Sequence, residues 1–311
     1  MTDKPQPGGP GRLGTTTVAR VGYGAMQLGE ARSPGDAVAV LRRAVELGVD
    51  HIDTASFYAG GEVNDHIRRA LAPYRDDLVI VSKVGAAHVT GGPIPLRAAQ
   101  KPAELRAAVE DDLRQLGLDC VPVVNLRRLD LGPGLAAEGD QIVDLDDQLA
   151  EMIALRGKGK IGAIGVSSVP VEVLRRALPA GIVCVQNAYS LLDRCHEDML
   201  DFCTAEGIAW VPFFPLGSAF SGFPDVAGNT VVREVAGEIG ATPAQVGLAW
   251  LLAHAPNTFL IPGTRSIAHL EENVGAAGVA LTEEALARLD GVSTPEESPR
   301  YQHGIEPFQD R

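Results

Sequence analysis

The sequence lacks the features that would place it in a membrane, on a nucleic acid or in an oxidising compartment. Its longest apolar runs, such as Val246–Ala253, are too short to span a bilayer, and its N-terminus lacks the charged-then-apolar order expected of a secretory signal. A net charge of -13 leaves no basic excess for a nucleic-acid partner. The four cysteines form neither a CxxC pair nor a zinc-ligand cluster. We expect a cytoplasmic protein with free thiols and with no metal, membrane or nucleic-acid partner.

A glycine-rich dinucleotide motif is also missing from the place where an open, doubly wound sheet needs it. Gly9, Gly11 and Gly14 satisfy the GxGxxG pattern, but Pro10 lies inside it and no apolar strand precedes it. This absence disfavours the doubly wound fold, which otherwise shares the local pattern of this chain. The Pro/Gly-rich residues 1–14 are instead expected to form a flexible N-terminal segment.

From Val18 onward, short β-branched runs alternate with amphipathic helical stretches, an order typical of parallel strands joined by crossover helices. In the first helix, Ser33 can cap the start, Asp36 can complete a capping box, and Gly48 supplies a left-handed stop. Strands are expected at Val21–Met26, Asp50–Asp53, Leu78–Lys83, Val121–Asn125, Ile161–Val166, Ile182–Val185, Ala209–Pro212 and Thr258–Ile261. Further helices are expected at Glu62–Leu71, Pro102–Leu116, Asp144–Arg156, Pro170–Leu178, His196–Glu206, Asn229–Ile239, Pro243–Ala253 and Ile267–Ala276.

Eight strands with intervening helices predict an α/β fold, a (β/α)8 TIM barrel. We expect residues 15–311 to form this single barrel domain, with a C-terminal tail over the barrel mouth. The loop Gly85–Gln100, Phe220 and the tail Tyr301–Phe308 are expected to border the mouth, where such barrels vary their specificity.

Polar side chains end three successive predicted strands, at Asp53, Lys83 and Asn125. The active site of such a barrel lies at these C-terminal strand ends, and Tyr58 follows Asp53 closely enough to fold back over the mouth. Each residue alone has an ordinary structural explanation, but together Tyr58, Lys83 and Asp53 would place a tyrosine, a cation and an anion at one barrel mouth, as a general-acid assembly requires. A free phenol titrates near about pH 10, so the Lys83 cation, held by Asp53, would make Tyr58 a better acid towards a carbonyl oxygen.

Several motifs, in order from Gly22 to Asn273, resemble those of the aldo-keto reductases. "HIDTASFYAGGEVN" is similar to the segment that carries the catalytic aspartate and tyrosine, and "VSKVG" to the strand end with the catalytic lysine. "GKIGAIGVSS", "VQNAYSLLDR", "FFPLG" and "LIPGTRSIAHLEENV" resemble the cofactor-binding segments. The resemblance implies an NADPH-dependent oxidoreductase that reduces a small aldehyde or ketone by hydride transfer.

The same resemblance implies which residues hold the cofactor. Ser167 and Gln186 would bind the nicotinamide amide, and Phe213 would stack on its ring. Arg265 is expected to bind a 2′-phosphate and so to favour NADPH over NADH. The other implied positions are Met26 and Asp53 beside the nicotinamide, Leu216 and Ser218 at the pyrophosphate, and Gly263, Thr264, His269, Glu272 and Asn273 at the adenosine end.

Three positions depart from the family pattern. The strand end that usually offers a catalytic histidine reads "VVNLRRLD", which puts Asn125 there. Because an amide donates a hydrogen bond but carries no proton, we expect slow turnover, and faster turnover for Asn125→His if the pocket has room. Phe213 stands where tyrosine is common, and Ser167–Ser168 replaces a serine–asparagine pair.

Two alternatives stay open at this point. Reductase-like potassium-channel β subunits also have asparagine at that strand end and resemble the chain in this respect. This resemblance suggests a non-enzymatic NADPH-binding regulator. A Schiff-base lyase could use Lys83 as nucleophile if the pKa of Lys83 were depressed. The sequence specifies neither the substrate nor the oligomeric state.

Overall fold

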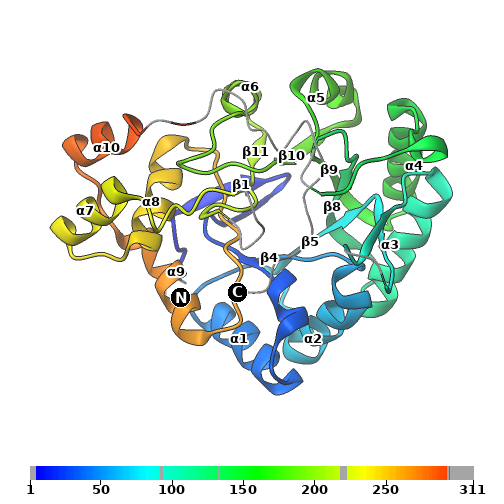
Figure 1. Ribbon diagram of the computed structural model, residues 1–311. Coiled ribbons are helices and arrows are strands. Elements are labelled where there is room, and N and C mark those ends of the chain that lie inside the picture. The colour runs from blue at the N-terminus through cyan, green and yellow to red at the C-terminus, as the bar shows by residue number, and fades with distance from the viewer. Residues whose placement is uncertain (1–4, 92–93, 132–133, 218–222, 293, 295–311) are drawn as a thin grey trace.

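The computed structural model describes residues 5–91, 94–131, 134–217, 223–292 and 294. Its central element is a parallel sheet in the order β11-β10-β9-β8-β5-β4-β3, curled around a common axis (Figure 1). The strands of this sheet are β3 (Tyr23–Gly24), β4 (His51–Asp53), β5 (Val79–Val84), β8 (Val121–Arg127), β9 (Ile161–Ser167), β10 (Ile182–Gln186) and β11 (Ala209–Trp210).

The segment that follows Asn257 closes this sheet into a barrel. Parallel bridges join Thr258 to Trp210 on one edge and Leu260 to Val21 on the other. The amide of Phe259 donates to the carbonyl of Trp210 at 2.7 Å, and the amide of Gly22 donates to that of Leu260 at 2.8 Å. The predicted (β/α)8 TIM barrel is therefore confirmed, with its eighth strand present as bridges between the two edges.

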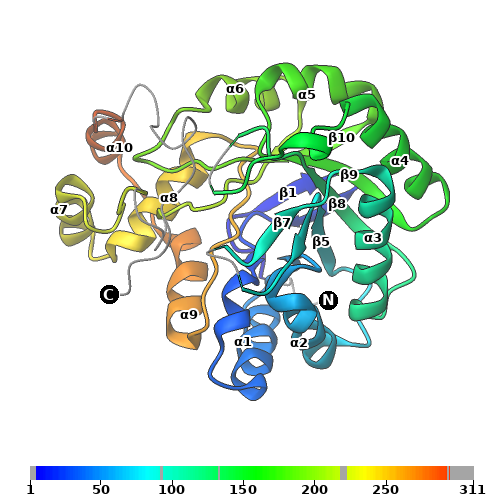
Figure 2. The ribbon, with the colours of Figure 1, turned by 45° about the vertical axis from the view of Figure 1, so that its right-hand side comes forward.

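Helices surround the barrel on its outer side (Figure 2). The predicted helices are confirmed with ends shifted by no more than two residues, and Ser33 caps the first one by accepting from the Asp36 amide at 3.2 Å. Glu283–Asp290 forms a further helix that sequence analysis did not predict. The α-helices are α1 (Pro34–Glu46), α2 (Glu62–Leu71), α3 (Pro102–Leu116), α4 (Leu145–Gly157), α5 (Val171–Ala177), α6 (Glu197–Glu206), α7 (Thr230–Ile239), α8 (Pro243–His254), α9 (Ile267–Gly275) and α10 (Glu283–Asp290). The 3-10 helices are η1 (Met26–Glu30), η2 (Tyr58–Gly61), η3 (Gly139–Gln141), η4 (Leu178–Ala180) and η5 (Ala276–Gly278).

A hairpin of β1 (Pro10–Leu13) and β2 (Thr16–Ala19) covers the N-terminal end of the barrel. Residues 10–13 therefore belong to a strand, and the prediction of a flexible segment over residues 1–14 was wrong for them. Gly14, at φ 66, allows the tight turn, and Leu13 packs with Phe259 and other side chains inside the barrel. The apolar face of a short hairpin is enough to order a Pro/Gly-rich stretch.

A second hairpin, β6 (Ala86–His88) and β7 (Leu96–Ala98), forms much of the predicted mouth loop. Strand β6 contacts η2, which begins with Tyr58. Residues 92 and 93 of this loop, Phe220 and the predicted tail over the mouth lie outside the described residues. Within the described ranges, no helix is long and apolar enough to cross a membrane.

Candidate active site

A buried ion pair stands at the C-terminal end of β4 and β5. The ammonium of Lys83 donates to Oδ1 of Asp53 and to the carbonyl oxygen of Thr54, the latter at 3.1 Å. The two side chains are only 6% and 4% exposed. The second carboxylate oxygen, Oδ2 of Asp53, accepts from Nε2 of Gln186 at 2.8 Å. Because each partner has further hydrogen bonds, the pair is well satisfied despite its burial.

Tyr58 lies directly over this pair. It begins η2, and Nζ of Lys83 is 5.1 Å from the centroid of its ring. The backbone turns back on itself after Tyr58 through Ala59, Gly60 and Gly61, which all have positive φ. The ring of Phe57 packs edge-on against Tyr58, with centroids 5.2 Å apart. The structure thus brings together the tyrosine, cation and anion that the strand ends indicate.

The surroundings of Lys83 keep its ammonium charged. Burial alone lowers the pKa of Lys83, but the negative charge and hydrogen bonds offered by Asp53 and Tyr58 raise it above its ordinary value. A lysine nucleophile needs the opposite shift, towards the neutral amine. This arrangement argues against the Schiff-base lyase.

Strand β8 runs two residues beyond its predicted end, which changes the place of Asn125. Asn125 pairs in register with Lys83 on one side and Gly165 on the other, and it is 0% exposed. Its Oδ1 accepts from the thiol of Cys184 at 3.2 Å, whereas its Nδ2 has no partner among the described residues. Asn125 is therefore an interior residue of the barrel, and the strand ends at Arg127.

Sequence analysis missed Arg127 as a site residue. It lies on the same face of β8 as Asn125, two residues nearer the mouth, because side chains alternate along a strand. Burial lowers the pKa of Arg127, and the charge of Tyr58 acts against that shift. The two-residue alternation from Asn125 could have indicated it.

The structure leads us to expect that Asn125→His does not increase turnover. A Cβ on Gly165 would lie only 2.0 Å from Oδ1 of Asn125, so the amide fills the space next to β9. An imidazole there overpacks the barrel, and we expect a loss of about 1–3 kcal/mol in the free energy of unfolding, with no gain in turnover. Urea unfolding and single-turnover hydride transfer across pH measure both effects. A stable variant with faster transfer would contradict this packing argument.

A buried carboxylate lies behind the ion pair, on α3. Asp112 is 0% exposed and accepts from Oγ of Ser82 at 2.7 Å and from Nδ2 of Asn64 at 2.9 Å. Oδ1 of Asn64 accepts in turn from the hydroxyl of Thr54 at 2.7 Å. Burial raises the pKa of Asp112 to about 7, although these hydrogen bonds and Lys83 oppose the rise.

Asp112 should give the protein a pH-dependent stability. Between about pH 4 and 7 the folded state keeps a proton that the unfolded chain has lost, so the free energy of unfolding falls as pH rises. The slope is at most about 1.4 kcal/mol per pH unit. Asp112→Asn should remove this contribution, as urea unfolding of both proteins from pH 5 to 8 can measure. Equal slopes in the two proteins would show that Asp112 does not titrate in this range.

The predicted nicotinamide residues end neighbouring strands. Ser167 of β9 and Gln186 of β10 are register partners, each 1% exposed. Oε1 of Gln186 and Oγ of Ser168 are buried and have no partner within the described chain. Unsatisfied buried acceptors are costly, so these atoms fit a bound carboxamide. Phe213 and the exposed Met26 follow the C-terminal ends of two other strands of the same barrel, β11 and β3.

The predicted adenosine residues lie around the start of α9. Arg265 is half exposed and forms an ion pair with Glu30 at 2.8 Å, next to the helix cap Ser266. The carbonyl oxygen of Thr264 accepts from the hydroxyl of Tyr23 at 2.5 Å, and Glu272 accepts from that of Thr242 at 2.5 Å. Gly263 is bridged to Gly24, and in α9 the side chain of His269 is exposed whereas that of Asn273 is buried. Leu216 packs against Gly247 of α8. Ser218 lies outside the described residues.

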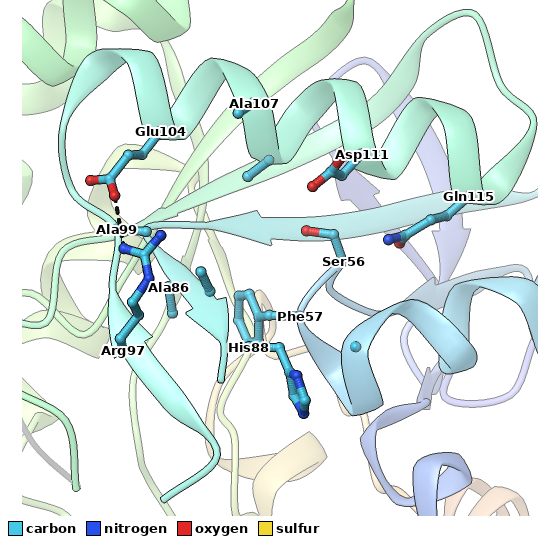
Figure 3. Close-up of a pocket in the computed structure, with 13 residues that line it drawn as sticks. Ser56, Phe57, Ala86, His88, Arg97, Ala99, Glu104, Ala107, Asp111 and Gln115 are labelled. Atoms are coloured by element: carbon cyan, nitrogen blue, oxygen red, sulfur yellow. Dashed lines mark hydrogen bonds and ion pairs between the residues drawn. The ribbon is translucent and has the colours of Figure 1, made fainter. Parts of the chain in front are cut away.

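A cavity of about 360 Å³ lies beside this constellation, between α3, the β6–β7 hairpin and the segment from Ser56 to Gly60 (Figure 3). Its wall includes Phe57, whose ring contacts Tyr58, and Arg97, which is paired with Glu104 at 2.8 Å. None of Asp53, Tyr58 and Lys83 lines it. The cavity is therefore separate from the ion pair at the barrel mouth.

The fold and the site together define an oxidoreductase class. Residues 20–294 match the model of the aldo/keto reductase family, and the chain belongs to this family. It is therefore an oxidoreductase of the aldo/keto reductase type.

Particular relatives cover nearly the whole chain. Pyridoxine 4-dehydrogenase of Escherichia coli is 47% identical over 289 residues, which are 90% of this chain and 97% of the relative. An uncharacterized oxidoreductase of Schizosaccharomyces pombe is 33% identical over 301 residues, covering 94% and 92% of the two chains. A solved aldo-keto reductase from Klebsiella pneumoniae in complex with NADPH has a TM-score of 0.77 and 27% identity, and the match covers 94% of this chain and 98% of that one.

Proposed function

We propose that this protein is an NADPH-dependent reductase that converts an aldehyde or ketone to an alcohol, with Tyr58 as the general acid. The observation that carries the proposal is the buried Lys83, held by Asp53 and placed against the ring of Tyr58 at the barrel mouth. The NADPH complex of the Klebsiella enzyme and the name of the 47% identical relative support the cofactor and the type of substrate.

NADPH, when bound, supplies the hydride that adds to the carbonyl carbon. Tyr58 donates its hydroxyl proton to the carbonyl oxygen, so that the products are an alcohol and the oxidised cofactor. The Lys83 cation stabilises the negative charge that develops on the Tyr58 oxygen, and Asp53 holds Lys83 in place. Gln186 donates to Asp53 and so connects the nicotinamide residues to this pair.

The chain's own atoms also suit the two ends of the cofactor. Oε1 of Gln186 and Oγ of Ser168 can accept from the nicotinamide amide, and Ser167 and Phe213 complete that part of the site. Arg265 and the N-terminus of α9 offer positive charge to the 2′-phosphate. None of the four cysteines, all of which lie in the described ranges, forms a disulfide, and this supports a reducing, cytoplasmic setting.

Arg265→Ala should weaken NADPH binding by about 1.5–3 kcal/mol and leave NADH binding nearly unchanged, because only NADPH carries the 2′-phosphate. The variant also loses the ion pair with Glu30, but this pair is exposed, so we expect little change in the free energy of unfolding. Calorimetric titration with both cofactors measures the difference. Arg75→Ala removes the same charge from an exposed pair with Asp77 and serves as the control. Equal losses for NADPH and NADH would remove Arg265 from the 2′-phosphate site.

The proposed reaction is tested by NADPH consumption with a panel of aldehydes, ketones, quinones and sugars, with NADH run alongside. Reduction of at least one class with NADPH is expected. Tight NADPH binding without consumption across the panel would favour the regulator alternative instead.

A further inference from the structure

Arg127 ends β8 with its side chain on the inner face of the barrel. Val123, on the same face of the strand, packs with Val79 and Val81 inside the barrel, whereas Val124 and Leu126 pack outwards with the helices. Asn125 is the next inward residue, level with Lys83. Arg127 is therefore the next inward residue towards the mouth, and it lies on the side of Lys83 and Asn125 that faces Tyr58.

The guanidinium of Arg127 is a cation without an internal counter-ion. In the described part of the chain no carboxylate forms an ion pair with it, and its buried Nε has no hydrogen-bond partner. The neighbouring Arg128 differs on both counts, since it binds Asp130 at 2.7 Å and Gln148 at 2.6 Å. A buried donor on a permanent cation costs free energy unless a ligand satisfies it.

The backbone of Arg127 is held firmly in place. The buried Gln100 donates its Nε2 to the carbonyl oxygens of both Gly85 and Arg127, at 2.6 and 2.8 Å. Gln148 in turn donates to Oε1 of Gln100 at 2.8 Å. Gly85, at φ 110, has no Cβ that would strike the Arg127 carbonyl. The cation is therefore presented from a fixed strand end, as a specific binding group requires.

We propose that Arg127 selects carbonyl substrates that carry an anionic oxygen beside the carbonyl group, such as an ionised hydroxyl on the adjacent ring carbon of an aromatic aldehyde. The inference rests on the proposed function, because it takes Tyr58 as the acid at the carbonyl oxygen. Arg127 then binds the neighbouring oxyanion while Tyr58 protonates the carbonyl oxygen.

Two sources offer this chemistry. One is an aromatic aldehyde with an acidic ortho hydroxyl, the pattern of the aldehyde made by oxidising pyridoxine at its 4-position, the reaction named for the E. coli relative. The other is an α-oxo acid, whose carboxylate adjoins the carbonyl. A guanidinium binds both kinds of oxyanion through charge-assisted hydrogen bonds.

The test compares matched substrates in the NADPH-loaded enzyme. 3-Hydroxypyridine-4-carbaldehyde and its 3-methoxy analogue differ in the anionic oxygen, and phenylglyoxylate and its methyl ester repeat the comparison for a carboxylate. Wild type should prefer the anionic member of at least one pair by about tenfold to hundredfold in kcat/KM, the range for a charged hydrogen bond. The pair that shows the preference identifies the source of the oxyanion.

Variants assign that preference to Arg127. Arg127→Met should reduce the ratio to within about threefold, because kcat/KM falls far more for the anionic member than for the uncharged one, and Arg127→Lys should retain part of the ratio because the charge stays. Arg75→Met removes an arginine remote from the mouth and should leave the ratio unchanged. Circular dichroism and NADPH affinity establish that each variant is folded.

Two results would overturn the proposal: a wild-type ratio near one for both pairs, or an unchanged ratio in Arg127→Met. An unchanged ratio produced by an equal loss for both members would place Arg127 on the carbonyl oxygen itself. If wild type reduced neither these four compounds nor any member of the wider carbonyl panel, the proposed function would fail. Calorimetric binding of the same pairs to the NADP+ complexes of wild type and Arg127→Met would still decide the selection, since only wild type should bind the anionic member about tenfold more tightly.

Discussion

Tyr58→Phe should slow carbonyl reduction by about 10²–10⁴-fold, the usual contribution of a positioned general acid, and leave NADPH affinity unchanged. Phenylalanine keeps the ring that packs over Lys83 and against Phe57, so the variant loses only the hydroxyl. Single-turnover oxidation of bound NADPH after mixing with an activated aldehyde measures the hydride-transfer rate, and a fluorescence titration measures cofactor affinity.

A second tyrosine supplies the control for this experiment. Tyr74 donates its hydroxyl to the carbonyl oxygen of Leu116 at 2.8 Å, away from the barrel mouth. Tyr74→Phe removes an equivalent hydroxyl group and should keep hydride transfer near the wild-type rate. Near wild-type transfer in Tyr58→Phe would mean that another group delivers the proton.

Lys83→Met should abolish most turnover and also destabilise the fold. The substitution leaves the Asp53 carboxylate buried without its cation, a change that typically costs about 3–5 kcal/mol in the free energy of unfolding. It also removes the charge that stabilises the Tyr58 oxygen as its proton leaves. Turnover and urea unfolding measure the two losses separately.

The double variant Asp53→Asn with Lys83→Met separates these causes. It removes both charges, so much of the lost stability should return, whereas turnover should stay as low as in Lys83→Met. Recovery of turnover together with stability would mean that the ion pair serves the fold alone. A Lys83→Met protein as stable as wild type would contradict the burial argument for the pair.

Local signals in the sequence were enough to predict most of the elements. Helix α1 begins and ends where Ser33 and Gly48 indicate, because a cap and a left-handed stop act within one turn of the chain. The closing strand 258–261 was predicted from its apolar run, although it pairs through bridges at both edges. The β1–β2 hairpin was missed because its order depends on packing with Phe259, far away in the sequence.

The candidate site likewise contains residues that local sequence signals indicate and contacts that depend on residues far apart in the sequence. Asp53, Tyr58 and Lys83 could be predicted because each lies at or just after the end of an apolar strand, and such ends meet at one face of a barrel. The contact between Gln186 and Asp53 joins residues 133 positions apart, and no local pattern indicates it. The extension of β8 to Arg127, which moves Asn125 inside, depends on pairing with β9 up to Ser167.

Rapid mixing of the stoichiometric NADPH complex with a reactive aldehyde tests the central claim most directly. We expect one equivalent of NADPH to be consumed and one equivalent of the alcohol to form in wild type, with both processes suppressed together in Tyr58→Phe. An NADPH complex that stays unreacted through the aldehyde panel, or that reacts equally fast without the Tyr58 hydroxyl, would contradict the proposed reductase mechanism.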